Sequence, residues 1–122
     1  MKNLGYMEGT DSVVLTTALT EGFETYPLSN GWDNHGKNLS HITTGDNLAA
    51  VIGYLHKFTV LFTHQTLEGL LSPLKACGVP LLIIVPKSQH EKAKSIFNVE
   101  NLNYKFVDPE DLMDEILKLP KE

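Results

Sequence analysis

The feature that most constrains the fold is an uninterrupted apolar run in the second half of the chain, "VPLLIIVP" at residues 79–86. A half-buried strand would alternate apolar and polar residues, but this run has no polar face. A strand without alternation is buried on both faces, which is typical of a parallel sheet covered by helices on each side. The sequence therefore predicts an α/β fold with this run inside the sheet.

Helical patterns flank this run. Residues 65–78 carry leucines at spacings of three, one and three, which form one stripe of a helix, and Gly78 is suited to end it. Residues 88–97 and 109–119 also have helical periodicity, and residues 103–108 alternate like a strand nearer an edge. Helices that alternate with strands over short loops imply parallel strands joined by right-handed crossovers.

The first half of the chain is harder to interpret. Residues 11–19 and 58–64 are rich in β-branched and aromatic residues and are predicted as strands, whereas residues 44–58 carry the apolar stripe of a helix. Residues 20–43 contain many Gly, Asn, Pro and Ser residues and predict a long functional or irregular loop, or else a hidden element. We expect residues 1–122 to form one domain, a three-layer α/β sandwich of Rossmann-like or flavodoxin-like kind with a mostly parallel four-stranded sheet.

Charge and composition exclude some classes of function. The net charge of −5 argues against a broad nucleic-acid surface, which needs clustered positive charge. All ten basic residues are Lys, so an anion site must use Lys, His or backbone N–H groups in place of the bidentate fork of Arg. With 42% hydrophobic residues, the chain is too apolar for a disordered protein.

The sequence also predicts where the protein resides. No window approaches the roughly 18 consecutive apolar residues of a membrane span, and "MKNLGYMEGTDS" lacks the apolar centre of a signal peptide. The single cysteine, Cys77, cannot form an internal disulfide, and no Cys/His spacing is typical of a zinc site. We therefore expect a cytoplasmic protein with no membrane contact, metal or cofactor.

Candidate site residues follow the predicted strands, because ligands of parallel α/β sheets bind beyond the carboxyl ends of the strands. His64 is the candidate catalytic residue, since an imidazole can serve as acid or base near neutral pH. The candidate ligand-binding residues at the strand ends are Thr16, Thr17, Gln65, Lys87 and Ser88. A purely structural interpretation stays open for each of these positions: His64 and Ser88 as helix caps, and Lys87 as a solvated turn residue.

A second group of candidates lies in the segment "GWDNHGKN", residues 31–38. Trp32 can stack on a base or sugar, and His35 can hydrogen-bond it, so both are candidate ligand-binding residues. The alternative is a Gly- and Asn-rich turn in which Trp32 covers the margin of the core. The familiar phosphate cradles are missing, because neither G-x-x-x-x-G-K-[ST] nor G-x-G-x-x-G occurs. "MEGTDSVV" precedes the first predicted strand, so it is not expected to form a strand-to-helix cradle.

These observations predict a small cytosolic α/β binding module that holds a small nucleotide-like or other anionic ligand, or a protein partner, at the carboxyl ends of its strands. A small sheet leaves an edge or face exposed, so a homo-oligomer is expected. The alternative is a small hydrolase or transferase acting on a nucleotide or sugar phosphate, with His64 as general acid or base and Lys87 holding the anion. The sequence does not decide between enzyme and binding module.

Overall fold

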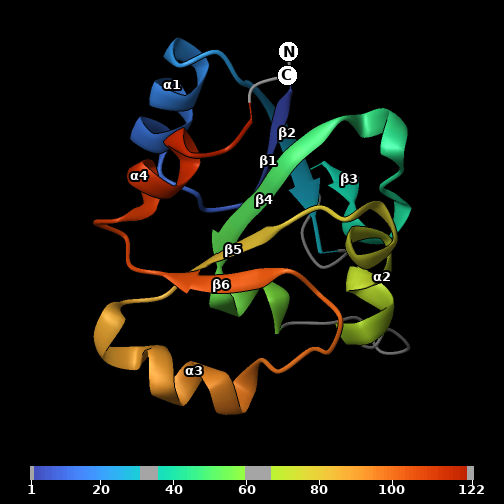
Figure 1. Cartoon of the computed structure of the whole chain (residues 1–122), viewed down its shortest axis with the longest axis vertical. Coiled ribbons are helices and arrows are strands. Elements are labelled where there is room, and N and C mark those ends of the chain that lie inside the picture. Colours follow the sequence, from blue (N-terminus) through green and yellow to red (C-terminus); the bar gives the residue numbers. More distant parts are fainter. Residues whose placement is uncertain (1, 31–35, 60–66, 121–122) are drawn as a thin grey trace.

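The computed structural model describes residues 2–30, 36–59 and 67–120. Its centre is a six-stranded, all-parallel sheet with the strand order β3-β2-β1-β4-β5-β6 (Figure 1). The strands are β1 (Asn3–Met7), β2 (Glu24–Ser29), β3 (Lys37–Asn38), β4 (Leu48–Tyr54), β5 (Leu81–Ile84) and β6 (Tyr104–Val107).

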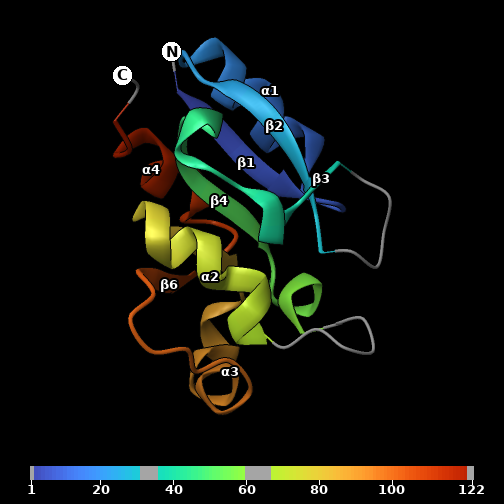
Figure 2. The same ribbon diagram turned by 90° about the vertical axis from the view of Figure 1, so that its right-hand side faces the viewer.

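Helices cover both faces of the sheet, and each face has its own core. The α-helices are α1 (Ser12–Thr20), α2 (Leu67–Cys77), α3 (His90–Ile96) and α4 (Leu112–Leu117). Side chains of α1 and α4 share one apolar core, and those of α2 and α3 share the other. In Figure 2, α2 lies in front of the sheet and α1 lies behind it. The described residues contain no helix long and apolar enough to cross a membrane.

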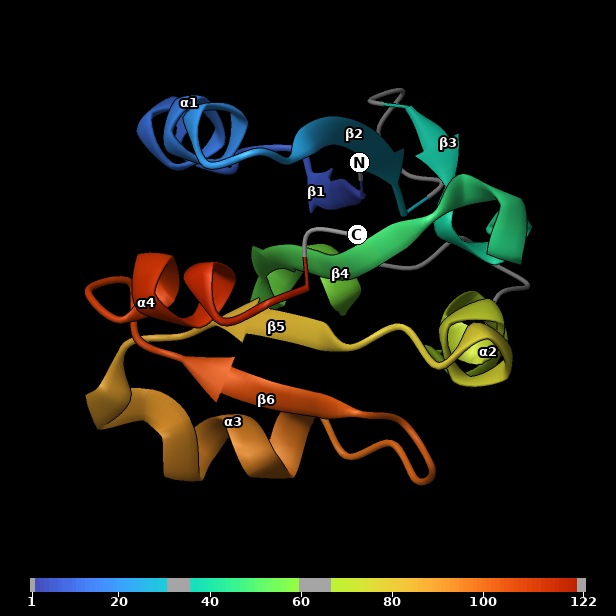
Figure 3. The same ribbon diagram turned by 45° about the horizontal axis from the view of Figure 1, so that its top comes forward.

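The strand order decides between the two fold types expected from the sequence. The order 3-2-1-4-5-6 is that of the Rossmann fold, whereas flavodoxin-like sheets are ordered 2-1-3-4-5. The chain runs outward from β1 to β3, returns to β4 beside β1, and then runs outward to β6 (Figure 3). The α/β prediction is confirmed, but the sheet has six strands and not four.

In the first half of the chain, the structure contradicts two of the sequence predictions. Residues 11–19 are not a strand, because Asp11 caps α1 by accepting a hydrogen bond from the backbone N–H of Val13 at 2.9 Å. Residues 44–58 are not a helix, because they contain β4, whose first six residues are all buried. A strand buried on both faces has no alternation, so its apolar positions can be mistaken for a helical stripe.

A further difference lies in residues 20–43, which contain β2 and β3 in place of one long loop. Pro27 conceals β2 in the sequence, because proline removes a ladder donor and argues against an inner strand. Here β3 pairs only with Leu28 and Ser29, so at Pro27 the strand has a neighbour on one side alone. The second half agrees well with prediction: β5 and β6 lie within 79–86 and 103–108, and α2 lies within 65–78.

Candidate functional site

The carboxyl edge of the sheet contains the point at which the strand order reverses, between β1 and β4. Crossovers leave these adjacent strands in opposite directions, and ligands of open α/β sheets bind in the resulting crevice. Since β1 begins at Asn3, residues 8–11 of "MEGTDSVV" do connect a strand to a helix at this edge. The sequence prediction that this stretch precedes the first strand was wrong, because β1 is short and contains a glycine.

Side chains and backbone from three loops meet at the reversal point. Lys57, in the 3₁₀ turn after β4 (Leu55–Phe58), places its Nζ 3.1 Å from Glu8 Oε1 in the loop after β1. The buried Asn30, just beyond β2, donates from Nδ2 to the carbonyl oxygen of Lys57 at 2.8 Å. The Lys57 side chain is only 15% exposed. The loops after β1, β2 and β4 are therefore tied together across the end of β1.

The floor beneath these contacts is tightly packed. A Cβ atom at Gly53, near the end of β4, would lie 2.6 Å from Cγ of the buried Met7 and 3.0 Å from Cζ of Phe58. Such contacts are too close for an alanine, so glycine allows β1 and the turn after β4 to approach each other. The backbone at the base of the candidate site is thus rigidly placed.

The loop between β1 and α1 is acidic. Gly9 has φ of +88°, a conformation that favours glycine. Thr10 donates from its hydroxyl to the carbonyl oxygen of Met7 at 2.8 Å, and Glu8 and Asp11 flank the two residues. Phosphate groups in Rossmann folds usually lie at the start of this helix. The two carboxylates oppose an anion at this position, so an anionic group would be held farther along the edge.

The loops after β5 and β6 form the second part of the edge. Lys87 and Ser88 lie in a 3₁₀ turn after β5 (Lys87–Gln89), and both are exposed. Asp108 follows β6 and accepts hydrogen bonds from the backbone N–H groups of Lys87 at 2.8 Å and Glu110 at 2.9 Å. The bond from Glu110 and then that from Lys87 lower the pKa of Asp108 below its usual value. An ionised carboxylate therefore fastens the two loops to each other.

His90, the first residue of α3, lies beside this carboxylate. Its Nε2 is 2.7 Å from the carbonyl oxygen of Val85, and its ring centroid is 5.9 Å from that of Phe106 in β6. The side chains of His90 and Lys87 both interact electrostatically with Asp108. The end of β5 and β6 thus gathers an ammonium, an imidazole and a carboxylate.

The sequence-predicted site residues have different locations. Lys87 and Ser88 lie at the carboxyl edge, as expected. Thr16 and Thr17 do not follow a strand but lie within α1, where the Thr17 hydroxyl donates to the carbonyl oxygen of Val13 at 2.9 Å. The remaining candidates, Trp32, His35, His64 and Gln65, lie outside the described residues.

Sequence reasoning missed Glu8, Asn30 and Lys57. Glu8 and Lys57 are 49 residues apart, and no motif links them, so only the order of the strands brings them together. A signal was nevertheless present, because Gly9, Thr10 and Asp11 form a turn-and-cap pattern directly before a helix. Recognising β1 would have assigned this pattern to the carboxyl edge.

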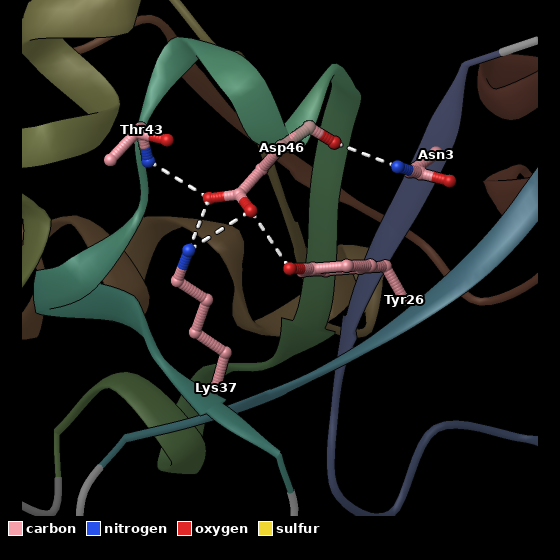
Figure 4. Close-up of polar contacts among 5 residues, drawn as sticks. All are labelled: Asn3, Tyr26, Lys37, Thr43 and Asp46. Atoms are coloured by element: carbon pink, nitrogen blue, oxygen red, sulfur yellow. Dashed lines mark hydrogen bonds and ion pairs between the residues drawn. The ribbon is translucent and has the colours of Figure 1, made fainter.

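A second polar cluster surrounds Asp46, which precedes β4 at the amino end of that strand (Figure 4). Its carboxylate accepts hydrogen bonds from Tyr26 Oη at 2.8 Å, Lys37 Nζ at 2.8 and 2.9 Å, and Thr43 N at 2.8 Å. Its backbone oxygen accepts a bond from Asn3 Nδ2 at 2.7 Å. The side chain of Asp46 is only 10% exposed.

The titration of this second cluster follows from its contacts. Burial acts to raise the pKa of Asp46, but hydrogen bonds from Lys37, Thr43 and Tyr26 outweigh it, so the pKa lies below its usual value. The hydrogen bond between Tyr26 and Asp46, together with burial and the negative charge of Asp46, raises the pKa of Tyr26. The bond to Asp46 likewise raises the pKa of Lys37. The donors to the Asp46 carboxylate come from β2, β3 and the turn before β4, so the cluster connects these three segments.

A small cavity of about 120 Å³ opens at the amino edge of the sheet, beside this cluster. Its lining includes Lys2, Thr43, Asn47 and the half-buried Cys77. It lies at the opposite end of the strands from the reversal point. Across residues 2–30, 36–59 and 67–120, no group of three or more His, Cys, Asp or Glu side chains is arranged to hold a metal ion.

Comparisons with known proteins do not assign the chain to a family. No protein-family model matches it, and no curated protein has a significantly similar sequence.

Proposed function

We propose that this chain is a small ligand-binding module whose ligand lies at the carboxyl edge of the sheet. The observation that carries the proposal is the reversal of strand order between β1 and β4, because ligands of open α/β sheets generally bind at such a reversal point. The tied loops around Glu8, Asn30 and Lys57 support it, because a preformed site loses little entropy when it binds a ligand.

The proposed ligand is a small anion, either nucleotide-like or simpler. Lys87 follows β5 and is exposed, whereas Lys57 is already paired with Glu8, and Asp11 repels anions from the start of α1. The anionic group is therefore proposed to lie on the β4–β5 side of the reversal point. A lysine binds such a group as a point charge, so affinity should fall with added salt.

A thermal-shift screen tests the proposal. Purified protein is heated with nucleotides, cyclic nucleotides, sugar phosphates and inorganic anions, and a ligand at one hundred times its dissociation constant should add roughly 2.7 kcal/mol of stability. Lys87→Gln should reduce the shift produced by any hit. Lys75→Gln, in the last turn of α2 at the opposite edge, removes the same charge and should not. No shift with any compound would contradict an anion-binding function.

The predicted homo-oligomer is a separate proposal, and α1 supports it. This helix has no charged residue, and its Val13 and Leu19 are 68% and 50% exposed. A helix that is uncharged on its outer face is better suited to contact than to solvent. Light scattering should report a mass above 13.6 kDa that Val13→Lys lowers. Ile96→Lys, on the exposed face of α3, is the matched control. A monomer at micromolar concentration would contradict this proposal.

The alternative enzymatic function assigns general acid or base chemistry to His64. That residue lies outside the described residues, so the alternative stays a prediction. Loss of turnover in His64→Ala, with ligand binding retained, would favour it over the binding module.

A further inference from the structure

His90 has a defined tautomer. A carbonyl oxygen can only accept a hydrogen bond, so the 2.7 Å contact between Nε2 and the oxygen of Val85 requires a proton on Nε2. In the neutral ring the other nitrogen, Nδ1, then carries a lone pair and is a hydrogen-bond acceptor. Among the described residues, no hydrogen-bond partner of Nδ1 is present. The ring therefore has one nitrogen committed to the backbone and one available.

The position of the ring is also defined. Phe106 packs against it, and the side chain is only partly exposed. The turn that leads to it is closed by a hydrogen bond from the backbone N–H of Gln89 to the carbonyl oxygen of Pro86 at 2.8 Å. Asp108 holds the same turn through the backbone N–H of Lys87. These hydrogen bonds hold the backbone of the turn before His90, and the packing of Phe106 restricts the ring. The position of Nδ1 is therefore defined.

The charged groups near His90 define the kind of ligand that this part of the edge can select. Asp108 interacts with His90 and Lys87, but its two oxygens already accept backbone N–H groups. Lys87 and Ser88, on the same turn, supply an ammonium and a hydroxyl at the surface. This part of the edge therefore combines a cation for an anionic group with an acceptor for a donor beside it.

We propose that Nδ1 of His90 is a hydrogen-bond acceptor of the ligand site, and that the ligand is a small anion carrying its own O–H group. The anionic oxygens contact Lys87, and the O–H group donates to Nδ1. Hydrogen phosphate and hydroxy acids have this chemistry, whereas sulfate does not. The inference rests on the proposed binding function and specifies its selectivity. A site that pairs this acceptor with a donor of the ligand discriminates against an analogue that lacks the donor, because the analogue forms one hydrogen bond fewer.

Inorganic phosphate and sulfate form a matched pair of probes. At about pH 8 both are mainly dianions, but only phosphate retains an O–H group. Each is titrated into the protein and followed by ¹H–¹⁵N NMR at constant ionic strength. We expect resonances of residues 87–90 to shift with phosphate, and sulfate to bind about tenfold more weakly, the effect of one net hydrogen bond.

Two substitutions separate the nitrogens of the ring. His90→Gln can still donate to the carbonyl oxygen of Val85 but has no acceptor at the position of Nδ1, so it should fold normally and lose the preference for phosphate. His90→Asn carries an amide oxygen near the position of Nδ1 and should retain part of that preference, although it loses the bond to Val85. His41→Gln, on an exposed residue after β3, is the control and should bind as the unmodified protein does.

The outcomes distinguish this inference from the proposed function. Equal binding of phosphate and sulfate, or an unchanged preference in His90→Gln, would overturn the role of His90 and leave an anion-binding site intact. Absence of any anion binding in the panel would overturn both. Long-range ¹H–¹⁵N spectra of the imidazole provide an independent test. A neutral His90 protonated on Nδ1 would refute the inference whichever anions bind.

Discussion

Asp46 and Asp108 both fasten a loop to the sheet, but their surroundings differ. The carboxylate of Asp46 is nearly buried and receives hydrogen bonds from a tyrosine, a lysine and a backbone N–H group. Asp108 lies at the carboxyl edge and receives two backbone N–H groups, while Lys87 and His90 beside it keep side-chain groups available. The first region uses its polar groups for stability, and the second leaves some available for the proposed ligand.

The largest expected effect is on folding, from Asp46→Ala. The substitution leaves the ammonium of Lys37, the hydroxyl of Tyr26 and the N–H group of Thr43 without their shared acceptor. Partly buried groups that lose a partner cost their desolvation free energy, so we expect the free energy of unfolding to fall by about 2–3 kcal/mol. Urea denaturation measures it. Asp114→Ala, on an exposed residue of α4, is the control. Equal losses of unfolding free energy in the two variants would contradict a special role of Asp46 in stability.

The second-largest effect is expected from acid, which should lower the contribution of Asp46 to the free energy of unfolding. Its pKa is lower in the folded protein than in the unfolded chain, so its contribution to stability is complete above the unfolded value of about 4 and is lost as pH falls through the folded value. Urea denaturation between neutral pH and about pH 3 should show this decline. In Asp46→Asn, the free energy of unfolding should decline less steeply over the same pH range. An unaltered slope in that variant would mean that other carboxyl groups govern acid unfolding.

A smaller loss of stability is expected from Tyr26→Phe, which removes one hydrogen bond to Asp46 and should cost about 1 kcal/mol. Since the pKa of Tyr26 is raised in the folded protein, its contribution is complete below the unfolded value of about 10 and is lost as pH rises through the folded value. The stabilities of the two proteins should therefore converge in alkali. Tyr54→Phe, on a partly exposed residue of β4, is the comparison.

The smallest effect is expected at the carboxyl edge, where Asp108→Asn should change ligand binding more than stability. Removing a negative charge beside Lys87 and His90 should tighten phosphate binding roughly two- to fivefold, and the gain should shrink as salt is added. Titration at two salt concentrations measures it. Tighter binding in Asp46→Asn by the same factor would show that the two regions do not differ in the way described.

The two halves of the chain also differ in how well the sequence predicts them. β5 and β6 have clear signals: one is apolar throughout, the other alternates, and Gly78 separates α2 from β5. β4 is as apolar as β5, but the two alanines within "LAAVIGY" favour a helical interpretation, because alanine has the highest helix propensity. α1 contains three threonines and two valines, so its composition favours a strand until Asp11 is recognised as its cap.

The sequence alone indicates that strands buried on both faces alternate with helices, that an anion site must use lysine, histidine or backbone N–H groups, and that Lys87 and Ser88 follow such a strand. These properties depend on neighbouring residues and on composition. The three-dimensional fold is needed to see that β1 lies beside β4, which brings Glu8 to Lys57, and that His90 commits one nitrogen to Val85. Contacts of this kind depend on strand order and on the approach of backbone to side chain, and neither leaves a periodic pattern in the sequence.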